Sequence, residues 1–193
     1  MKNLIKIIIV VLTLCSCNAQ QTYPLSTSTI WQYGNNNYIK DVDGVLIPFV
    51  GTWQWTQGNS SLTIKLVKVP RFKAPNDNYY KDQVLGGYKY IENGIIITDN
   101  LTFTTVWPDE TNVAGFAKML GSISYPKINE LMLIFTDVIK NKSCMAELTM
   151  ITNGGTPQLT WHLHDFQSYR NPNLGPKPLG FSIPTDIILT KIP

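Results

Sequence analysis

The sequence predicts an all-β domain, an antiparallel meander of about nine or ten strands that closes into a barrel. Aromatic and β-branched runs alternate with turn residues from Tyr38 to the C-terminus, and no amphipathic helix of ten or more residues interrupts them. The chain also shows no internal repeat. A meander must protect its outer strands from edge-to-edge pairing, and closure into a barrel does so completely. A two-sheet β-sandwich is the alternative architecture.

The first half of the domain contains the clearest strand signal. Leu62, Ile64 and Leu66 share one face of an expected strand over residues 61–69, while Thr63 points the other way. This alternation is typical of a strand with one buried face. The strands expected in this half are 52–56, 61–69, 83–91, 95–98 and 101–106.

Turn residues separate these strands. Asn93-Gly94 is the strongest short hairpin signal in the chain. Gly86-Gly87 inside a strand predicts a bulge or a sharp bend. Residues 70–78 are expected to form a long polar loop.

The second half continues the meander after residues 111–120, which are expected to form one short helix or a loop. Asn153-Gly154-Gly155 predicts a hairpin between two strands. Residues 170–180 contain three prolines and two glycines, so they are expected to be irregular. The strands expected in this half are 121–125, 131–137, 144–152, 158–165 and 186–192.

The N-terminal residues have the zones of a secretory signal. Lys2 and Lys6 give a positive beginning, and residues 7–14 form an apolar stretch. That stretch is too short to span a bilayer, which needs about 20 apolar residues.

A possible acylation site follows this apolar stretch. The segment Leu14-Cys15-Ser16-Cys17 resembles the lipobox of bacterial lipoproteins. The resemblance implies that the Cys17 thiol receives a diacylglyceryl group and becomes the new N-terminus. Two or three acyl chains hold a protein on a membrane far better than one. The alternatives are ordinary cleavage near Ala19, or retention of the leader as a membrane helix.

The leader divides the chain into three parts. Residues 1–16 are the expected signal peptide, residues 17–37 the lipidated N-terminus with a flexible polar tether, and residues 38–193 one domain. The anchor predicts a protein of the cell envelope, held on the outer or the inner membrane. Without acylation, the protein would be soluble in the periplasm or secreted.

Cysteine content predicts the state of the remaining thiol, and net charge limits the classes of binding partner. If Cys17 is acylated and Cys15 leaves with the leader, Cys144 is the one remaining thiol, which predicts a buried and inert cysteine. Removing Lys2 and Lys6 from the 16 basic residues leaves 14 against 13 acidic residues, a net charge of +1. This balance argues against nucleic acid as a partner, because nucleic acid requires a clustered basic face.

A short motif, Phe49-x-Gly51-Thr52-Trp53, carries the family resemblance. It resembles the opening of lipocalin-like proteins, which implies a barrel whose closed end is plugged by Trp53. The chain has no terminal helix pattern and no cysteine pair, so the resemblance to lipocalins concerns the fold alone.

The chain is also similar, over its whole length, to an uncharacterised family of exported lipoproteins from Bacteroidetes-type bacteria. That similarity rests on the leader, the Phe-x-Gly-Thr-Trp motif, a Tyr-x-Lys-Asp segment and a C-terminal Leu-Thr-Lys strand. In this chain the last two are Tyr38 to Asp41 and Leu189 to Lys191. The family implies no known activity.

The most site-like stretch contains the only two histidines of the chain, His162 and His164. On a strand they share a face and would both reach one metal ion. A third ligand would have to come from another strand, for example Asp137 or Glu147. The plainer interpretation is that both histidines face water, with metal binding and proton transfer as the alternatives.

Other motifs offer little chemistry. Asp41-x-Asp43-Gly44 resembles the first half of a calcium loop, but the remaining oxygen ligands are missing, so a solvated turn is expected. The sequence holds no nucleophile elbow, phosphate loop, zinc-protease motif or Cys-x-x-Cys pair. It therefore predicts no catalytic residue and no cofactor.

Trp53 and Trp55 lie two residues apart and so share a face. Such aromatic side chains either line a pocket for a small apolar ligand or pack as ordinary core. Three hypotheses follow. The first is a lipid-anchored, lipocalin-like binding or recognition module. The second is a structural or interaction protein of the envelope with a filled core, and the third is a metal-dependent enzyme that uses His162 and His164.

Overall fold

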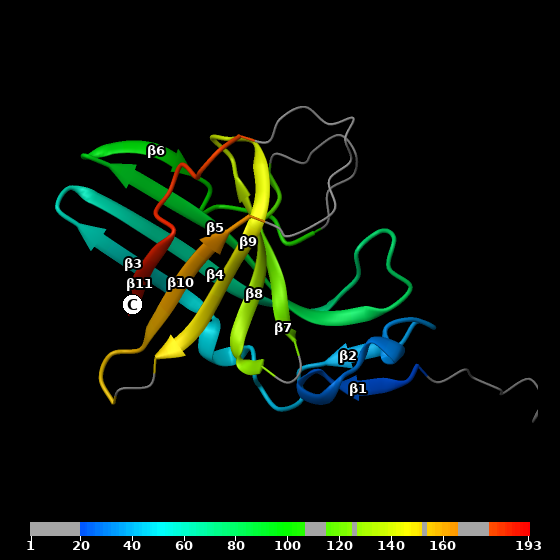
Figure 1. The fold of residues 1–193 in the computed structure, drawn as a ribbon. Coiled ribbons are helices and arrows are strands. Elements are labelled where there is room, and N and C mark those ends of the chain that lie inside the picture. Colours follow the sequence, from blue (N-terminus) through cyan, green and yellow to red (C-terminus); the bar gives the residue numbers. More distant parts are fainter. Residues whose placement is uncertain (1–19, 107–114, 125–126, 152–153, 166–177) are drawn as a thin grey trace, which may run out of the picture.

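The computed structural model describes residues 20–106, 115–124, 127–151, 154–165 and 178–193 (Figure 1). The leader with Cys15 and Cys17 lies outside these ranges, as does Asn153 of the second expected hairpin. Most of the expected irregular segment 170–180, and part of the expected helix or loop at 111–120, also lie outside them.

Eight strands form a closed antiparallel barrel, as the alternating pattern predicts (Figure 1). Each strand pairs with the next along the chain, β5 pairs with β7, and β11 returns to pair with β3. The barrel, rather than the sandwich, is therefore the observed architecture. Its strands are β3 (Gly51–Gln57), β4 (Ser60–Phe72), β5 (Tyr80–Glu92), β7 (Met119–Ser124), β8 (Lys127–Asp137), β9 (Lys142–Ile151), β10 (Gln158–His164) and β11 (Asp186–Ile192).

In the part of the chain that the structure describes, three strands and three short 3₁₀ helices lie outside the eight-strand barrel. The strand β6 pairs antiparallel with β5, and β2 pairs in parallel with both β1 and β5. Among the described residues, 3₁₀ helices are the only helices, and none is long and apolar enough to cross a membrane. The additional elements are β1 (Thr22–Pro24), η1 (Leu25–Thr27), η2 (Ile30–Gln32), β2 (Tyr38–Lys40), η3 (Ile47–Phe49) and β6 (Ile95–Asp99).

In its described part, residues 20–37, the N-terminal segment differs from the flexible tether expected over residues 17–37. From Thr22 onward it forms β1, η1 and η2, and it packs on the barrel. Leu25 has no exposed surface and belongs to the main core, and Asn37 is also buried. The polar composition of the segment suggested a tether, but one buried leucine and parallel pairing with β2 are enough to hold it on the domain.

The hairpin predicted at Asn93-Gly94 is confirmed. It joins β5 to β6, and both residues have positive φ angles, 51° and 82°, as a two-residue hairpin turn of this type requires. The strand β4 also extends beyond the predicted strand, to Phe72, through a register shift after Val69.

Of the bulge or sharp bend expected at Gly86-Gly87, the bulge is wrong, because both residues keep a regular register with β4. Glycine is needed there for a different reason. A Cβ atom on Gly87 would lie 1.9 Å from the backbone oxygen of Asn100, which crosses the outside of the barrel at this point. The pair therefore marks a close approach between two backbone segments.

The strand expected at residues 101–106 is also wrong. This segment leaves β6 and makes only an isolated bridge between Thr104 and Phe116. Phe103 instead packs against a second, smaller core that includes Phe72 and Leu85. Its apolar residues, which read as a strand, serve to cover the outer wall of the barrel.

The main core fills the inside of the barrel. Its buried side chains include Trp53, Tyr88, Phe135 and Trp161, each with less than 2% of its surface exposed. The Phe135 ring lies 4.7 Å from that of Tyr88 and 5.5 Å from that of Trp161, the latter edge to face. These three rings form a continuous aromatic contact.

Candidate functional site

Trp53 lies where the chain enters the barrel. Its side chain is fully buried, and its indole N–H donates a hydrogen bond to the carbonyl oxygen of Phe49, 2.8 Å away. The Lys191 ammonium group lies 5.2 Å from the centre of the indole ring. The segment from Phe49 to Trp53 and the C-terminal segment that contains Lys191 therefore meet at this tryptophan, which joins η3 to β3 and β11.

Trp55, two residues further along β3, is half-buried and packs against the same core. The two tryptophans share a face, as the alternation predicts. Around them the core is occupied by large side chains of the protein itself, among them Phe135, Tyr88 and Trp161. Trp53 and Trp55 are therefore part of a packed interior.

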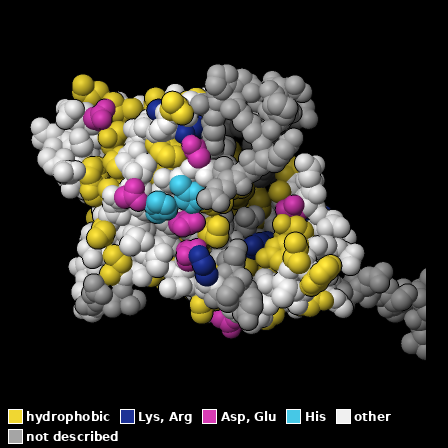
Figure 2. Space-filling model, in the orientation of Figure 1, with side chains coloured by type: hydrophobic (Ala, Val, Ile, Leu, Met, Phe, Trp, Pro, Cys, Tyr) yellow, Lys and Arg dark blue, Asp and Glu magenta, His cyan; other side chains and the backbone are white. Residues whose placement is uncertain are grey.

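His162 and His164 lie together on the outer wall of the barrel, where Figure 2 shows their rings surrounded by acidic side chains. The ring centres are 5.3 Å apart and the rings are stacked. Nδ1 of His162 lies 2.5 Å from the Asp186 carboxylate, and Nε2 of His164 lies 3.1 Å from Glu147. The half-exposed His162 thus has a partner on β11, and His164 has one on β9.

This arrangement distributes the two histidines over separate carboxylates. Glu147 is one of the two acidic residues considered from the sequence, whereas Asp137 is buried and bonded elsewhere. Among the described residues, no three His, Cys, Asp or Glu side chains are arranged to hold a metal ion. Hydrogen bonding to His162, and then to Thr185, holds the pKa of the Asp186 carboxyl below its usual value.

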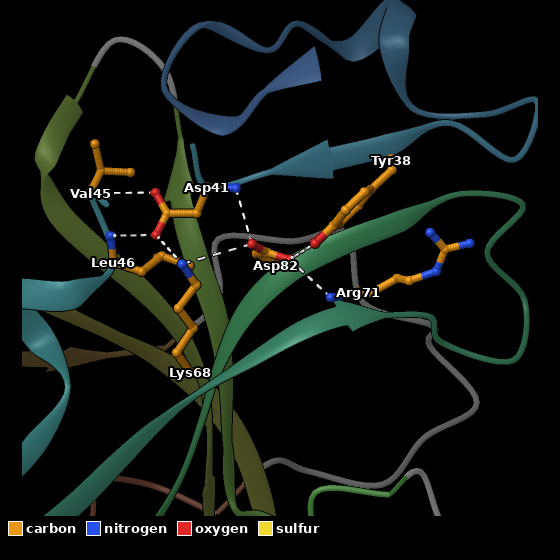
Figure 3. Close-up of polar contacts among 7 residues, drawn as sticks. All are labelled: Tyr38, Asp41, Val45, Leu46, Lys68, Arg71 and Asp82. Atoms are coloured by element: carbon orange, nitrogen blue, oxygen red, sulfur yellow. Dashed lines mark hydrogen bonds and ion pairs between the residues drawn. The ribbon is translucent and has the colours of Figure 1, made fainter. Parts of the chain in front are cut away.

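A buried polar network, which joins β2 to the strands β4 and β5, was not predicted from the sequence (Figure 3). Its centre is Asp82 at the start of β5, which is 2% exposed. Asp82 accepts hydrogen bonds from the Tyr38 hydroxyl at 2.5 Å, the Arg71 N–H at 2.9 Å and the Asp41 N–H at 3.1 Å. One carboxylate therefore ties β2 to both β4 and β5.

Asp41 belongs to the same network, so the solvated turn expected at this residue is wrong. Its side chain is fully buried, accepts hydrogen bonds from the N–H groups of Val45 and Leu46, and forms an ion pair of 2.7 Å with Lys68. Lys68 also lies 3.8 Å from Asp82. Both carboxylate oxygens of Asp41, which a calcium ion would need as ligands, therefore already have partners within the protein. The hydrogen bonds from Val45 and Leu46 also fix the loop before η3.

The sequence does contain one signal for this network. The alternation that turns Leu62, Ile64 and Leu66 inward on β4 continues to Lys68. An ammonium group on an inward face needs a nearby carboxylate, because an unpaired buried charge is strongly unfavourable. Nothing in the local sequence identifies Asp41 and Asp82 as the partners, since they meet only through the fold.

Tyrosines near this end are expected to make the protein sensitive to alkaline pH. Burial, followed by the hydrogen bond to Asp82, raises the pKa of Tyr38 from 10.0 to about 12, and burial raises the pKa of Tyr79 to about 12. Because folding favours the protonated phenols, their contribution to stability is complete below pH 10 and is lost as the pH rises toward 12.

We therefore expect the urea midpoint to fall between these two pH values. Ultraviolet absorbance of the phenolates should show some tyrosines ionising later in the native protein than in urea. Tyr38→Phe should remove part of the late ionisation. If every tyrosine of the native protein titrates near its unfolded pKa, the assignment of Tyr38 and Tyr79 is wrong.

A second network closes the end of β8. The buried Asp137 accepts hydrogen bonds from Ser182, through its N–H at 2.8 Å and its hydroxyl at 2.5 Å, and from the N–H of Lys140. Across the same turn the Lys142 ammonium group, almost fully buried, lies 3.2 Å from Asp165. It also donates a hydrogen bond to the Pro178 carbonyl. These contacts hold the segment before β11 against the barrel.

Cys144 lies on β9 with no exposed surface, and its thiol lies 3.5 Å from the Phe135 carbonyl oxygen. A thiol in this position is enclosed by the core and is not accessible to a substrate.

Comparison with known proteins places the chain in one family. No curated protein and no solved structure matches it. One family model matches residues 1–192, and its description is a family of unknown function, DUF6705. Because the match covers almost the whole chain, this eight-stranded barrel with its N-terminal extension belongs to the DUF6705 family.

Proposed function

We propose that this protein is a lipid-anchored recognition or interaction protein of the bacterial cell envelope, which binds its partner through its outer surface. The filled interior of the barrel carries this proposal. Proteins that hold a small apolar ligand enclose it in a cavity of about 300–1,000 Å³. Here the large side chains of Trp53, Tyr88, Phe135 and Trp161 occupy the core.

The filled interior therefore favours the interaction hypothesis over a lipocalin-like carrier of small apolar ligands. The histidine pair lends less support to a metal-dependent enzyme, because His162 and His164 pair with different carboxylates. A rigid barrel with exposed loops and an ordered N-terminal extension suits display of a binding surface.

The anchor in this proposal is a diacylglyceryl group on Cys17. Support comes from the apolar stretch followed by Leu14-Cys15-Ser16-Cys17, which resembles a lipobox. The short motifs also resemble those of exported lipoproteins from Bacteroidetes-type bacteria, and we propose that the protein is one of them. Its place of action would then be the outer or the inner membrane.

The chain contains a matched pair of variants that tests the anchor. In bacteria fed with labelled palmitate, the wild-type protein and Cys15→Ser should incorporate label, whereas Cys17→Ser should not. Mass spectrometry of the mature wild-type protein should show an acylated N-terminal cysteine. Labelling of Cys17→Ser, or an unlabelled wild-type protein with a mature N-terminus after Cys17, would show that the anchor is wrong.

A further inference from the structure

We propose that the N-terminal end of the protein lies against the anionic surface of the membrane that carries its anchor, with Trp31 at the depth of the lipid headgroups. This inference rests on the acylation of Cys17 proposed above. It assigns a membrane-docking role to η2 and to a neighbouring cluster of tyrosines and cations.

The first argument is the short distance between the anchor and the folded domain. Only two residues lie between Cys17 and Gln20, so their Cα atoms, three steps apart along the chain, are separated by at most about 11 Å. The Gln20 side chain donates a hydrogen bond to the carbonyl oxygen of Asn36. Because the expected tether is folded where the structure describes it, from Gln20 onward, an acyl group on Cys17 would hold the surface around Asn36 close to the headgroup layer.

The second argument is the exposure of large apolar side chains at this end. Ile30 and Trp31 of η2 are 78% and 91% exposed. The helix is nevertheless held in place, since the Gln32 side chain accepts a hydrogen bond from the Thr29 N–H and the Gln32 carbonyl accepts one from Asn37. An ordered, outward-facing tryptophan is typical of side chains that sit at a membrane interface.

Other exposed apolar side chains gather at the same end. Of the twelve large hydrophobic side chains exposed in the described ranges, four lie between residues 30 and 47. The two besides Ile30 and Trp31 are Val42 and Ile47, in the loop that a Ser26–Asp43 hydrogen bond connects to η1. Figure 2 shows hydrophobic side chains on the right of the molecule, the side on which Figure 1 places β1 and β2.

The third argument is the charge beside η2. Arg71 and Lys73 lie over the Tyr80 ring, 4.4 Å and 5.0 Å from its centre, and Lys81 lies 5.0 Å from the centre of the Tyr33 ring. We call these five residues, together with Tyr79, which packs edge to face on Tyr33, the basic tyrosine face.

The basic tyrosine face adjoins the place where the described chain begins. The Lys73 ammonium group lies 3.4 Å from the side-chain oxygen of Asn36, the residue whose carbonyl binds Gln20. Asp77, beside Tyr79, is partly exposed, and Asp43, in the loop that carries Val42, is exposed and accepts a hydrogen bond from Ser26. Asp41 and Asp82 are buried within the network of Figure 3. The exposed cations therefore suit anionic lipid headgroups.

Quenching by brominated lipids tests the docking directly. The acylated full-length protein would be reconstituted into vesicles of equal parts phosphatidylethanolamine and phosphatidylglycerol, with or without bromine on the acyl chains. We expect Trp31→Phe to remove more than half of the bromine-dependent quenching of tryptophan fluorescence. Trp55→Phe, the control on the barrel, should leave that quenching largely unchanged.

Charge reversal provides an independent variant. Lys73→Glu combined with Lys81→Glu should reduce the quenching of Trp31 at least twofold, whereas Lys65→Glu, on the exposed wall of β4, should not. Equal quenching in wild type and Trp31→Phe would overturn the docking proposal, even when the protein is firmly anchored.

Failure of the anchor would be recognised separately, because the purified protein would carry no acyl mass. The same vesicles, added in excess to that non-acylated protein, would still decide the docking. Quenching that depends on Trp31 would support docking on the membrane surface, and the absence of such quenching would overturn the docking proposal.

Discussion

Replacing Trp161 with alanine is expected to lower the free energy of unfolding by about 3–5 kcal/mol, the range for removal of a buried aromatic side chain. Trp161 is 1% exposed, packs edge to face on Phe135, and donates an indole hydrogen bond to the Pro184 carbonyl at 3.1 Å. The variant leaves a cavity in a close-packed interior and loses that hydrogen bond. Urea unfolding followed by far-ultraviolet circular dichroism measures the effect.

Two further variants show whether burial causes the loss. Trp31→Ala removes a side chain that is 91% exposed and should change stability by less than about 0.5 kcal/mol. Trp161→Phe keeps most of the aromatic volume and should fall between wild type and Trp161→Ala, which also covers the case in which the alanine variant does not fold. If Trp161→Ala costs less than about 1 kcal/mol, the interior is not close-packed and the carrier hypothesis regains support.

Replacing Asp82 with alanine is expected to destabilise the attachment of the N-terminal segment by about 3–5 kcal/mol, the cost of breaking a buried charged network by removing one member. The Tyr38 hydroxyl and the backbone N–H groups of Asp41 and Arg71 would lose their acceptor. Lys68 would keep only Asp41 as a partner.

Hydrogen exchange can localise this effect. The N–H of Tyr38 is bonded to Gln21 and that of Tyr80 to Asn37, so both amides report on β2. Their protection should fall by a factor between roughly 100 and 4,000, since about 1.4 kcal/mol corresponds to a factor of ten. Glu92→Ala, at an exposed acid at the opposite end of β5, is the control and should leave both amides protected. Unchanged exchange in Asp82→Ala would show that Asp82 does not hold β2 on the barrel.

Periodicity predicted the barrel because it depends on residues close in the sequence. The alternation around Leu62 and Ile64, and the turn at Asn93-Gly94, are local properties of strands and hairpins, and the structure contains both. The same local criteria failed for the segment at 101–106, where apolar residues cover the outside of the barrel instead of extending the sheet.

Candidate chemistry depended more strongly on the fold. The sequence placed His162 and His164 on one face of a strand, but the pairing of Asp186 with His162 follows from the register between β10 and β11. Asp41 looked like part of a solvated turn, yet it is buried beside Lys68, which lies 27 positions later in the chain. Such contacts join residues from separate strands, so no local pattern contains them.

The sequence by itself therefore determined the fold class of this protein, since strand alternation and hairpin turns are set by neighbouring residues. Only the tertiary structure decided that Trp53 and Trp161 belong to a filled interior, because the packing of a barrel depends on side chains from all of its strands. It also decided that residues 22–37 form part of the folded domain, through the burial of Leu25 and the pairing of β1 with β2. Those contacts outweigh the polar composition of the segment, because a single set of buried apolar and backbone contacts is enough to order a short stretch of chain.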